Sequence, residues 1–234
     1  MAEAGVCVVA GVGPGTGAAC SRRFAAEGYR VAMLARNRGR LEEFEASIPG
    51  TRGFPVDLTD PRQVTEVVQQ VRSELGPVEV LVYNAARGTF GGFLEIEPEE
   101  LEANFRVNTL GLLHLARELA PSMIEAARGS IIVTGNTSAR RGKAHYAAFA
   151  PTKAAQRILA ESMARDLGPK GVHVAYVVID AVIDLPWTRK RMPERPDEFY
   201  ARPDAIAETV LRLVEQDRSA WSFEVDLRPF GEEW

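Results

Sequence analysis

The chain has 234 residues, of which 46% are apolar and 26% charged, and its formal net charge is −4. This length suits one sizeable α/β core and is short for two ordinary domains. The small net charge and the dispersed basic residues argue against nucleic-acid binding. No apolar run approaches the length of a membrane span, and the N-terminus lacks a basic stretch followed by an apolar one, so we expect a cytoplasmic protein that binds no membrane. Cys7 and Cys20 are expected to be buried thiols, with no disulfide and no metal site.

Short apolar runs alternate with longer segments of helical periodicity along the whole chain. The runs predict strands at residues 5–11, 29–34, 51–56, 78–84, 130–135, 172–179 and 221–227. Helices are predicted within residues 15–28, 38–48, 60–76, 97–127, 151–168 and 203–216. Several strands are apolar almost throughout, as expected when helices cover both faces of a parallel sheet. The pattern predicts a single α/β domain of the doubly wound Rossmann type, with a seven-stranded parallel sheet and helices on both faces.

A glycine-rich stretch, "VVAGVGPGTGAAC", follows the first strand and opens the first helix. Gly11, Gly13, Gly15 and Gly17 permit backbone conformations closed to other residues and let the chain approach a pyrophosphate. The helix starting near Gly15 would point its free amides at that anion. The pattern predicts dinucleotide binding, and a tight structural turn is the alternative.

Cofactor preference is read at the end of the second strand, in "AMLARNRGR". An acid there would hold the adenosine ribose hydroxyls and repel a 2′-phosphate, but Ala35 occupies that position. Arg36 follows immediately, with Arg38 beyond, and a guanidinium can hold a phosphate with two parallel hydrogen bonds. We therefore predict NADP(H) as the cofactor, unless these arginines are simply solvated.

Several motifs together resemble the short-chain dehydrogenase/reductase family over the whole chain. They are "AGVGPGTG", "VDLTD", "VYNAA", "RVNTLG" and "MARDLGPKGVHVAYV". The resemblance implies that Asp57 bonds the adenine amino group and that Asn84 belongs to the cofactor site. It also implies that Asn108 holds a structural water and the catalytic lysine, Lys153, which binds the nicotinamide ribose. Two long helical segments resemble those that pair in the family, so we expect a homodimer or homotetramer.

The same resemblance implies a mechanism, from which this sequence departs. In the family a tyrosine exchanges a proton with the carbonyl oxygen while hydride passes to or from nicotinamide, and a neighbouring ammonium stabilises the phenolate. Here Phe149 stands in the tyrosine position, four residues before Lys153. A divergent bacterial branch of the family resembles this chain in "AAFA" and "VVID", which indicates that the phenylalanine is a feature of that branch.

Two further departures concern the family's serine and its Pro-Gly segment. Thirteen residues before Phe149 lies Asn136, with Thr137 and Ser138 adjacent, and Asp180 and Ala181 replace the Pro-Gly that normally covers the nicotinamide. Any of the three polar side chains at 136–138 could bind an oxyanion while water supplies the proton.

Tyr146 and His145 are the candidates for a replacement proton donor. Pro151 fits only in the first turn of a helix, so Tyr146 lies at or just before the helix start, and its hydroxyl either reaches the reacting oxygen or lines the pocket. His145 is expected in the preceding loop, where solvent exposure is the alternative. The predicted catalytic residues are Lys153, Asn108, Tyr146 and Ser138; the predicted cofactor-binding residues are Gly11, Gly13, Gly15, Gly17, Arg36, Asp57, Asn84 and Lys153.

The sequence favours an NADP-dependent oxidoreductase that acts on a small-molecule carbonyl or alcohol with an atypical proton donor. A catalytically inactive NADP-binding regulatory or partner-binding protein is the alternative. A non-redox lyase or isomerase that uses Asp180 and Asp184 as acid–base groups is a third possibility. Residues 180–204 are rich in proline, arginine and acids, which predicts an irregular functional segment, with 185–204 as a substrate-lid loop.

Overall fold

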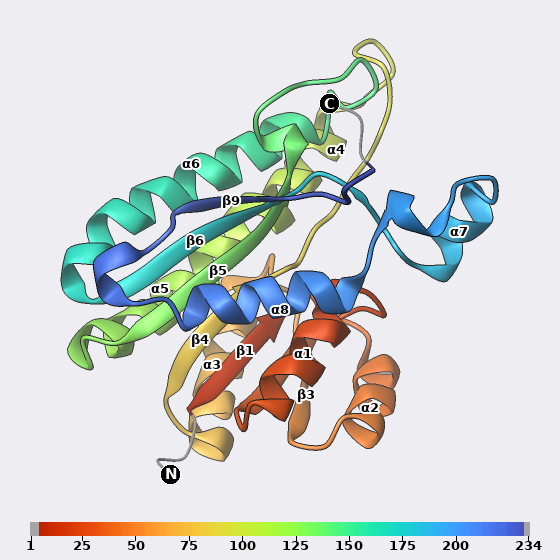
Figure 1. Ribbon diagram of the computed structural model, residues 1–234. Helices are drawn as coiled ribbons and strands as arrows, with labels where there is room; N and C mark the ends of the chain where they lie inside the picture. Colours follow the sequence, from red (N-terminus) through yellow and green to blue (C-terminus); the bar gives the residue numbers. More distant parts are fainter. Residues whose placement is uncertain (1–4, 232–234) are drawn as a thin grey trace.

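The computed structural model describes residues 5–231. Seven strands form one parallel sheet in the order β3-β2-β1-β4-β5-β6-β9, which confirms the predicted fold class (Figure 1). Their bounds are β1 (Val6–Ala10), β2 (Arg30–Ala35), β3 (Thr51–Pro55), β4 (Val78–Tyr83), β5 (Gly129–Asn136), β6 (Val172–Ile179) and β9 (Glu224–Leu227). The strand order reverses direction between β1 and β4, and ligands of open parallel sheets bind at the carboxyl ends of the strands beside such a switch point.

Helices cover both faces of the sheet, as Figure 1 shows. The helices α3 (Pro61–Leu75), α5 (Gly111–Glu125) and α6 (Ala150–Leu167) pack on one face, and α1 (Thr16–Ala26), α2 (Arg38–Ser47) and α8 (Pro203–Val214) pack on the other. Side chains of β1 alternate between the two cores, since successive residues of a strand point to opposite faces. Cys7 and Cys20 are free and buried in the second core, where burial raises the pKa of both thiols.

The helix predicted over residues 97–127 is interrupted. It consists of α4 (Pro98–Phe105), a π-helical turn at Arg106–Leu110 and α5. In the π turn the main-chain hydrogen bonds skip one residue more than in an α-helix, and such turns are frequent at functional sites. Asn108 lies in the middle of this turn and is fully buried.

The segment predicted to be irregular, residues 180–204, is more ordered than expected. It contains the short parallel pair β7 (Val182–Ile183) and β8 (Tyr200–Ala201), and the helix α7 (Pro186–Arg191) stands between them. Arg189 holds the segment together: its guanidinium lies 4.1 Å from the Tyr200 ring centroid and 2.7 Å from the Asp184 carboxylate. Proline and charged residues concealed this order because they serve as a helix start and as ion-pair partners here.

The remaining short elements are 3₁₀ turns at Thr137–Ala139, Gly168–Lys170, Asp197–Phe199 and Arg218–Ala220. Within the described residues, no helix is both long enough and apolar enough to cross a lipid bilayer.

Candidate functional site

The glycine-rich stretch forms a tight turn between β1 and α1. Among its four glycines only Gly11 has a positive φ, 87°, and a Cβ at this position would lie 2.4 Å from the main chain of Ala85. A Cβ at Gly17 would lie 2.6 Å from the Gly11 carbonyl oxygen. These two glycines are therefore required by the packing of the turn itself, independently of any ligand.

The other two glycines of the turn face different surroundings. A Cβ at Gly13 would meet no atom within 4 Å, so this part of the turn is open to a ligand. Gly15 lies under the Leu185 side chain, whose Cδ2 atom would be 3.1 Å from an added Cβ. Thr16 begins α1, and its hydroxyl is buried with no hydrogen-bond partner within the described part of the chain. The turn thus combines an open approach with the amino end of an 11-residue helix.

A cavity of about 750 Å³ extends from this turn along the carboxyl ends of β1, β2 and β4. It is about the size of a cofactor site. Its lining includes Gly11, Gly13, Arg36, Arg40, Asp57 and Asn84.

Positive charge gathers at the β2 end of the cavity. Arg36 and Arg40 line it, whereas Arg38 does not. Across residues 5–231, no acidic partner engages any of these three guanidinium groups. Asn37 accepts a hydrogen bond from the Arg40 main-chain N–H at 2.9 Å and so caps α2, which fixes the direction in which this turn leaves the strand. Unpaired guanidinium groups at a cavity wall are suited to holding a phosphate.

Asp57 and Asn84 lie at the cavity wall, and both are oriented by the protein. The Asp57 carboxylate accepts hydrogen bonds from the Thr59 main-chain N–H at 2.9 Å and from its hydroxyl at 2.8 Å. The Asn84 carboxamide donates to the Gly11 carbonyl at 2.9 Å and accepts from the Thr134 hydroxyl at 3.0 Å. Asn84 therefore joins the glycine turn to β4 and β5.

Asn108 and Lys153, predicted to act together, are connected through a third residue. The Asn108 carboxamide is held by the Arg87 main chain and, at 2.8 Å, by the Thr152 hydroxyl. Its main-chain carbonyl instead accepts a hydrogen bond from the Gln156 side-chain amide at 2.6 Å. The oxygen of the same amide accepts a short hydrogen bond from the Lys153 ammonium.

Lys153 is 2% exposed, and its Nζ also donates to the Thr134 carbonyl at 3.2 Å. Burial lowers the pKa of Lys153 to about 7. Gln156 is not among the predicted site residues, although its position three residues after Lys153 places both side chains on one helix face.

An aromatic cluster occupies the position of the missing tyrosine. Phe149 is buried at the start of α6, and its ring centroid lies 5.3 Å from that of Phe90 and 6.3 Å from that of Tyr146. The helix begins at Ala150, so Tyr146 precedes it, as predicted. Tyr146 is half-buried, and within the described residues no hydrogen bond engages its hydroxyl. Its hydroxyl is therefore available to a ligand.

The other candidate proton donors and oxyanion binders lie in different settings. Ser138 is buried, and its main-chain N–H donates to the Asn136 carboxamide at 3.0 Å, which fixes the turn after β5. His145 is exposed, as expected for a loop residue. Asp184 is held by Arg189, whose hydrogen bonds lower the pKa of its carboxyl group, and Asp180 lies 3.8 Å from Arg141. A carboxyl group with a lowered pKa is a poor proton donor, which weighs against Asp184 in the lyase possibility.

The short chain dehydrogenase family matches residues 5–192, most of the described chain. The chain belongs to this family. L-xylulose reductase of Bos taurus is 29% identical over 223 residues, which cover 91% of this chain and 89% of that protein. Carbonyl reductase (NADPH) 2 of Sus scrofa is 30% identical over 223 residues, with the same coverage of both chains.

A solved relative shares the whole fold of this short-chain dehydrogenase. The structure of a metagenomic short-chain oxidoreductase in complex with NADP matches it with a TM-score of 0.84 and 29% identity, over 96% of this chain and 97% of that one. The resemblance predicted from the sequence motifs is thereby confirmed.

Proposed function

We propose that this short-chain dehydrogenase is an NADP(H)-dependent oxidoreductase that interconverts a small-molecule carbonyl compound and its alcohol. One observation carries the proposal: a single cavity runs from the glycine turn to the guanidinium groups of Arg36 and Arg40. A dinucleotide needs both features, because its pyrophosphate sits at a helix amino end and its 2′-phosphate needs a cation. Membership of the family, an NADPH-named relative and a neighbour in complex with NADP support the choice.

The residues of the cavity fit this cofactor on their own chemistry. The open side of Gly13 admits the pyrophosphate, and the unpartnered Thr16 hydroxyl lies at the helix end that would face it. Arg36 would hold the 2′-phosphate, and Asp57 would meet the adenine. Asn84 would act indirectly, by holding the Gly11 carbonyl in position through its hydrogen bond. When bound, the cofactor supplies or removes the hydride at the substrate carbon.

Tyr146 is the proton donor in this proposal. In the direction of reduction, a C–H bond forms with the incoming hydride, and the Tyr146 O–H bond breaks as its proton passes to the substrate oxygen. Water then reprotonates the phenolate. The unengaged hydroxyl of Tyr146 supports this role, and Ser138 would orient the substrate oxygen. Lys153 would bind the nicotinamide ribose, and Asn108 would complete the catalytic set by positioning Lys153 through Gln156.

Residues 185–204 form the substrate lid in the same proposal. Leu185 already lies over Gly15, at the turn that the cofactor would approach, and Trp187 on α7 is 60% exposed.

The exposed face of α4 offers a second apolar surface. An apolar groove there is lined by Leu101, Phe105, Leu110 and Pro151. We propose that a partner subunit of a homodimer or homotetramer covers this groove. Light scattering at several protein concentrations measures that state.

The test is binding first and turnover second. NADPH fluorescence is titrated with the protein, and NADPH oxidation is then followed with a panel of ketones, diketones, sugars and quinones. The proposal expects saturable NADPH binding and oxidation with at least one class of carbonyl compound. Tight binding with no oxidation across the panel would overturn the catalytic part and favour a regulatory NADP-binding protein. Absence of binding would overturn the whole proposal.

A further inference from the structure

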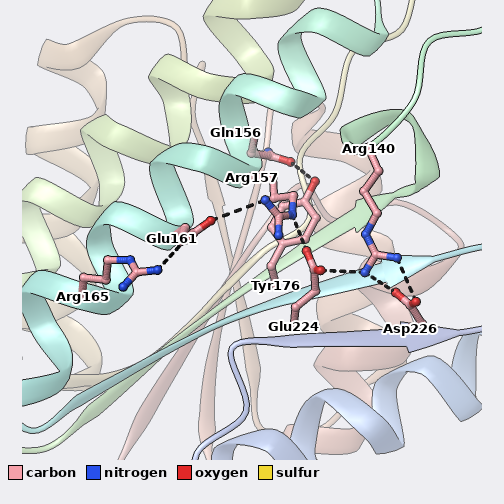
Figure 2. A network of polar contacts seen from close by, with 8 residues as sticks. All are labelled: Arg140, Gln156, Arg157, Glu161, Arg165, Tyr176, Glu224 and Asp226. Atoms are coloured by element: carbon pink, nitrogen blue, oxygen red, sulfur yellow. Dashed lines mark hydrogen bonds and ion pairs between the residues drawn. The ribbon is translucent and has the colours of Figure 1, made fainter.

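The Gln156 side chain stands at the centre of a buried polar cluster formed by α6, the π turn and the sheet. The residue is 0% exposed. Its Nε2 donates to the Asn108 carbonyl at 2.6 Å, and its Oε1 accepts from the Lys153 ammonium. The Tyr176 hydroxyl of β6 donates to the same oxygen at 3.4 Å (Figure 2). All polar atoms of this amide are therefore directed at named partners.

Only one orientation of the amide satisfies these partners. An ammonium group has donors and no acceptor, so it requires the amide oxygen, and a main-chain carbonyl has no donor, so it requires the amide NH₂ group. A reversed amide would bring N–H groups against the ammonium and an oxygen against the Asn108 carbonyl. The cluster thus forces the amide oxygen toward Lys153.

We propose that Gln156 is the positioning residue for Lys153: its amide links the ammonium directly to the Asn108 carbonyl. Lys153 acts through contact with the nicotinamide ribose, so the consequence of this link for catalysis rests on the proposed function. The link itself does not.

An amide bridge and a water bridge differ in what they can transfer. Water accepts one proton and donates another, whereas a side-chain amide holds its N–H protons throughout the physiological pH range. Gln156 therefore fixes the position of Lys153 and gives its proton no path toward Asn108. Any proton that Lys153 exchanges must therefore pass by a route other than the Gln156 amide.

Gln156 also sets how readily Lys153 ionises. Its oxygen and the Thr134 carbonyl of β5 are both acceptors, and acceptors favour the charged form of an amine that burial otherwise disfavours. The other groups around the cluster contribute no free charge. Burial raises the pKa of Tyr176, so this residue stays neutral, and Arg157 pairs with Glu224 on the outer side of the cluster (Figure 2).

The sequence makes a direct test practical, because the chain has only four lysines: Lys143, Lys153, Lys170 and Lys190. Lysine isotope-labelled at Cε gives a separate NMR signal for each, and the signal missing from Lys153→Met identifies Lys153. Its chemical shift against pH then reports its ionisation without cofactor or turnover. The variants are Gln156→Met, which keeps the shape and removes all three polar contacts, and Gln156→Glu, which adds a negative charge.

Gln156→Met is expected to raise the acid dissociation constant of Lys153 about 10-fold or more, a fall of at least about one pH unit in its midpoint, because the charged form loses an acceptor. Gln156→Glu is expected to move the midpoint upward. Gln70→Met is the matched control: this glutamine also lies on a helix and pairs with a side chain of the next turn, but on the surface. It should leave the midpoint unchanged. Circular dichroism of each variant checks folding.

An unchanged Lys153 midpoint in folded Gln156→Met and Gln156→Glu would overturn the proposal. If the wild type oxidises NADPH, the pH profile of kcat should move with the NMR midpoint, whereas a purely structural glutamine would lower kcat without moving it. A shifted midpoint in a protein that never turns over would keep this proposal and refute the proposed function. Turnover with no shift would do the opposite.

Discussion

Arg36→Ala is expected to weaken NADPH binding by about 10- to 30-fold and to change NADH binding by no more than about twofold. A hydrogen bond to a charged group contributes about 1.5–3 kcal/mol. Arg36 is exposed at the cavity wall, and solvent screening reduces its contribution to about 1.5–2 kcal/mol. Since about 1.4 kcal/mol is a factor of ten in affinity, the expected loss follows. NADH has no 2′-phosphate, so its binding loses nothing at this position.

The assay is fluorescence titration of both cofactors with wild type, Arg36→Ala and Arg38→Ala. Arg38 carries the same charge two residues away but does not line the cavity, so its removal controls for a general loss of positive charge. The difference between wild type and Arg36→Ala should shrink at high salt, because mobile ions screen exposed charges. Equal losses for NADPH and NADH, or equal effects of the two substitutions, would refute the assignment of Arg36 to the phosphate.

Three further substitutions test other parts of the site. In Gly11→Ala, the new Cβ would lie 2.4 Å from the Ala85 main chain, at a residue whose φ is 87°. Urea denaturation should therefore show a loss of at least about 2 kcal/mol in the free energy of unfolding. An unchanged denaturation midpoint would contradict this packing. Burial lowers the pKa of Lys153 to about 7 in the folded protein. Between this pH and about pH 10.4, the ordinary pKa of a lysine, the unfolded chain therefore binds one proton more than the folded protein. Wild-type stability relative to Lys153→Met should therefore rise by about 1.4 kcal/mol per pH unit in that window, and parallel pH curves would show that the ammonium group is not desolvated. Tyr146→Phe should lower kcat by about 10²- to 10⁴-fold and leave the Kd for NADPH unchanged, whereas an unchanged kcat would exclude Tyr146 as the proton donor.

The fold was predictable because its signals are local. Five of the seven strands, β1, β2, β4, β5 and β6, are short apolar runs, and the helices between them show their periodicity within a few turns. The π turn at Arg106–Leu110 was not predicted, because one additional residue shifts a helical pattern too little to be seen in a single sequence. The order within residues 180–204 was missed because it depends on contacts of Arg189 with residues on both sides of it in the sequence.

The candidate site was likewise predictable only in part. The glycine turn and Arg36 follow directly after strands, so their place at the carboxyl edge of the sheet could be inferred from the order of elements. The spacing places Gln156 beside Lys153, but its role could not be inferred, because that role requires α6, the π turn and β6 to meet, and a glutamine in a helix carries no signal of that contact. The direction of Tyr146 depends on its aromatic neighbours Phe90 and Phe149, and its role in proton transfer stays a prediction.

The π turn has a consequence for insertions and deletions. Asn104 donates to the Ala148 carbonyl at 2.9 Å, and Thr109, five residues later, donates to the Thr152 carbonyl at 3.0 Å. In a regular α-helix, residues five apart point about 140° away from each other, so both could not reach the start of α6. Deleting a single residue within 106–110 would restore an unbroken α-helix and rotate one of these contacts away. Such a variant would keep its helical content, and a far-ultraviolet spectrum would not reveal that the segment bearing Tyr146 and Phe149 had lost one of these two contacts.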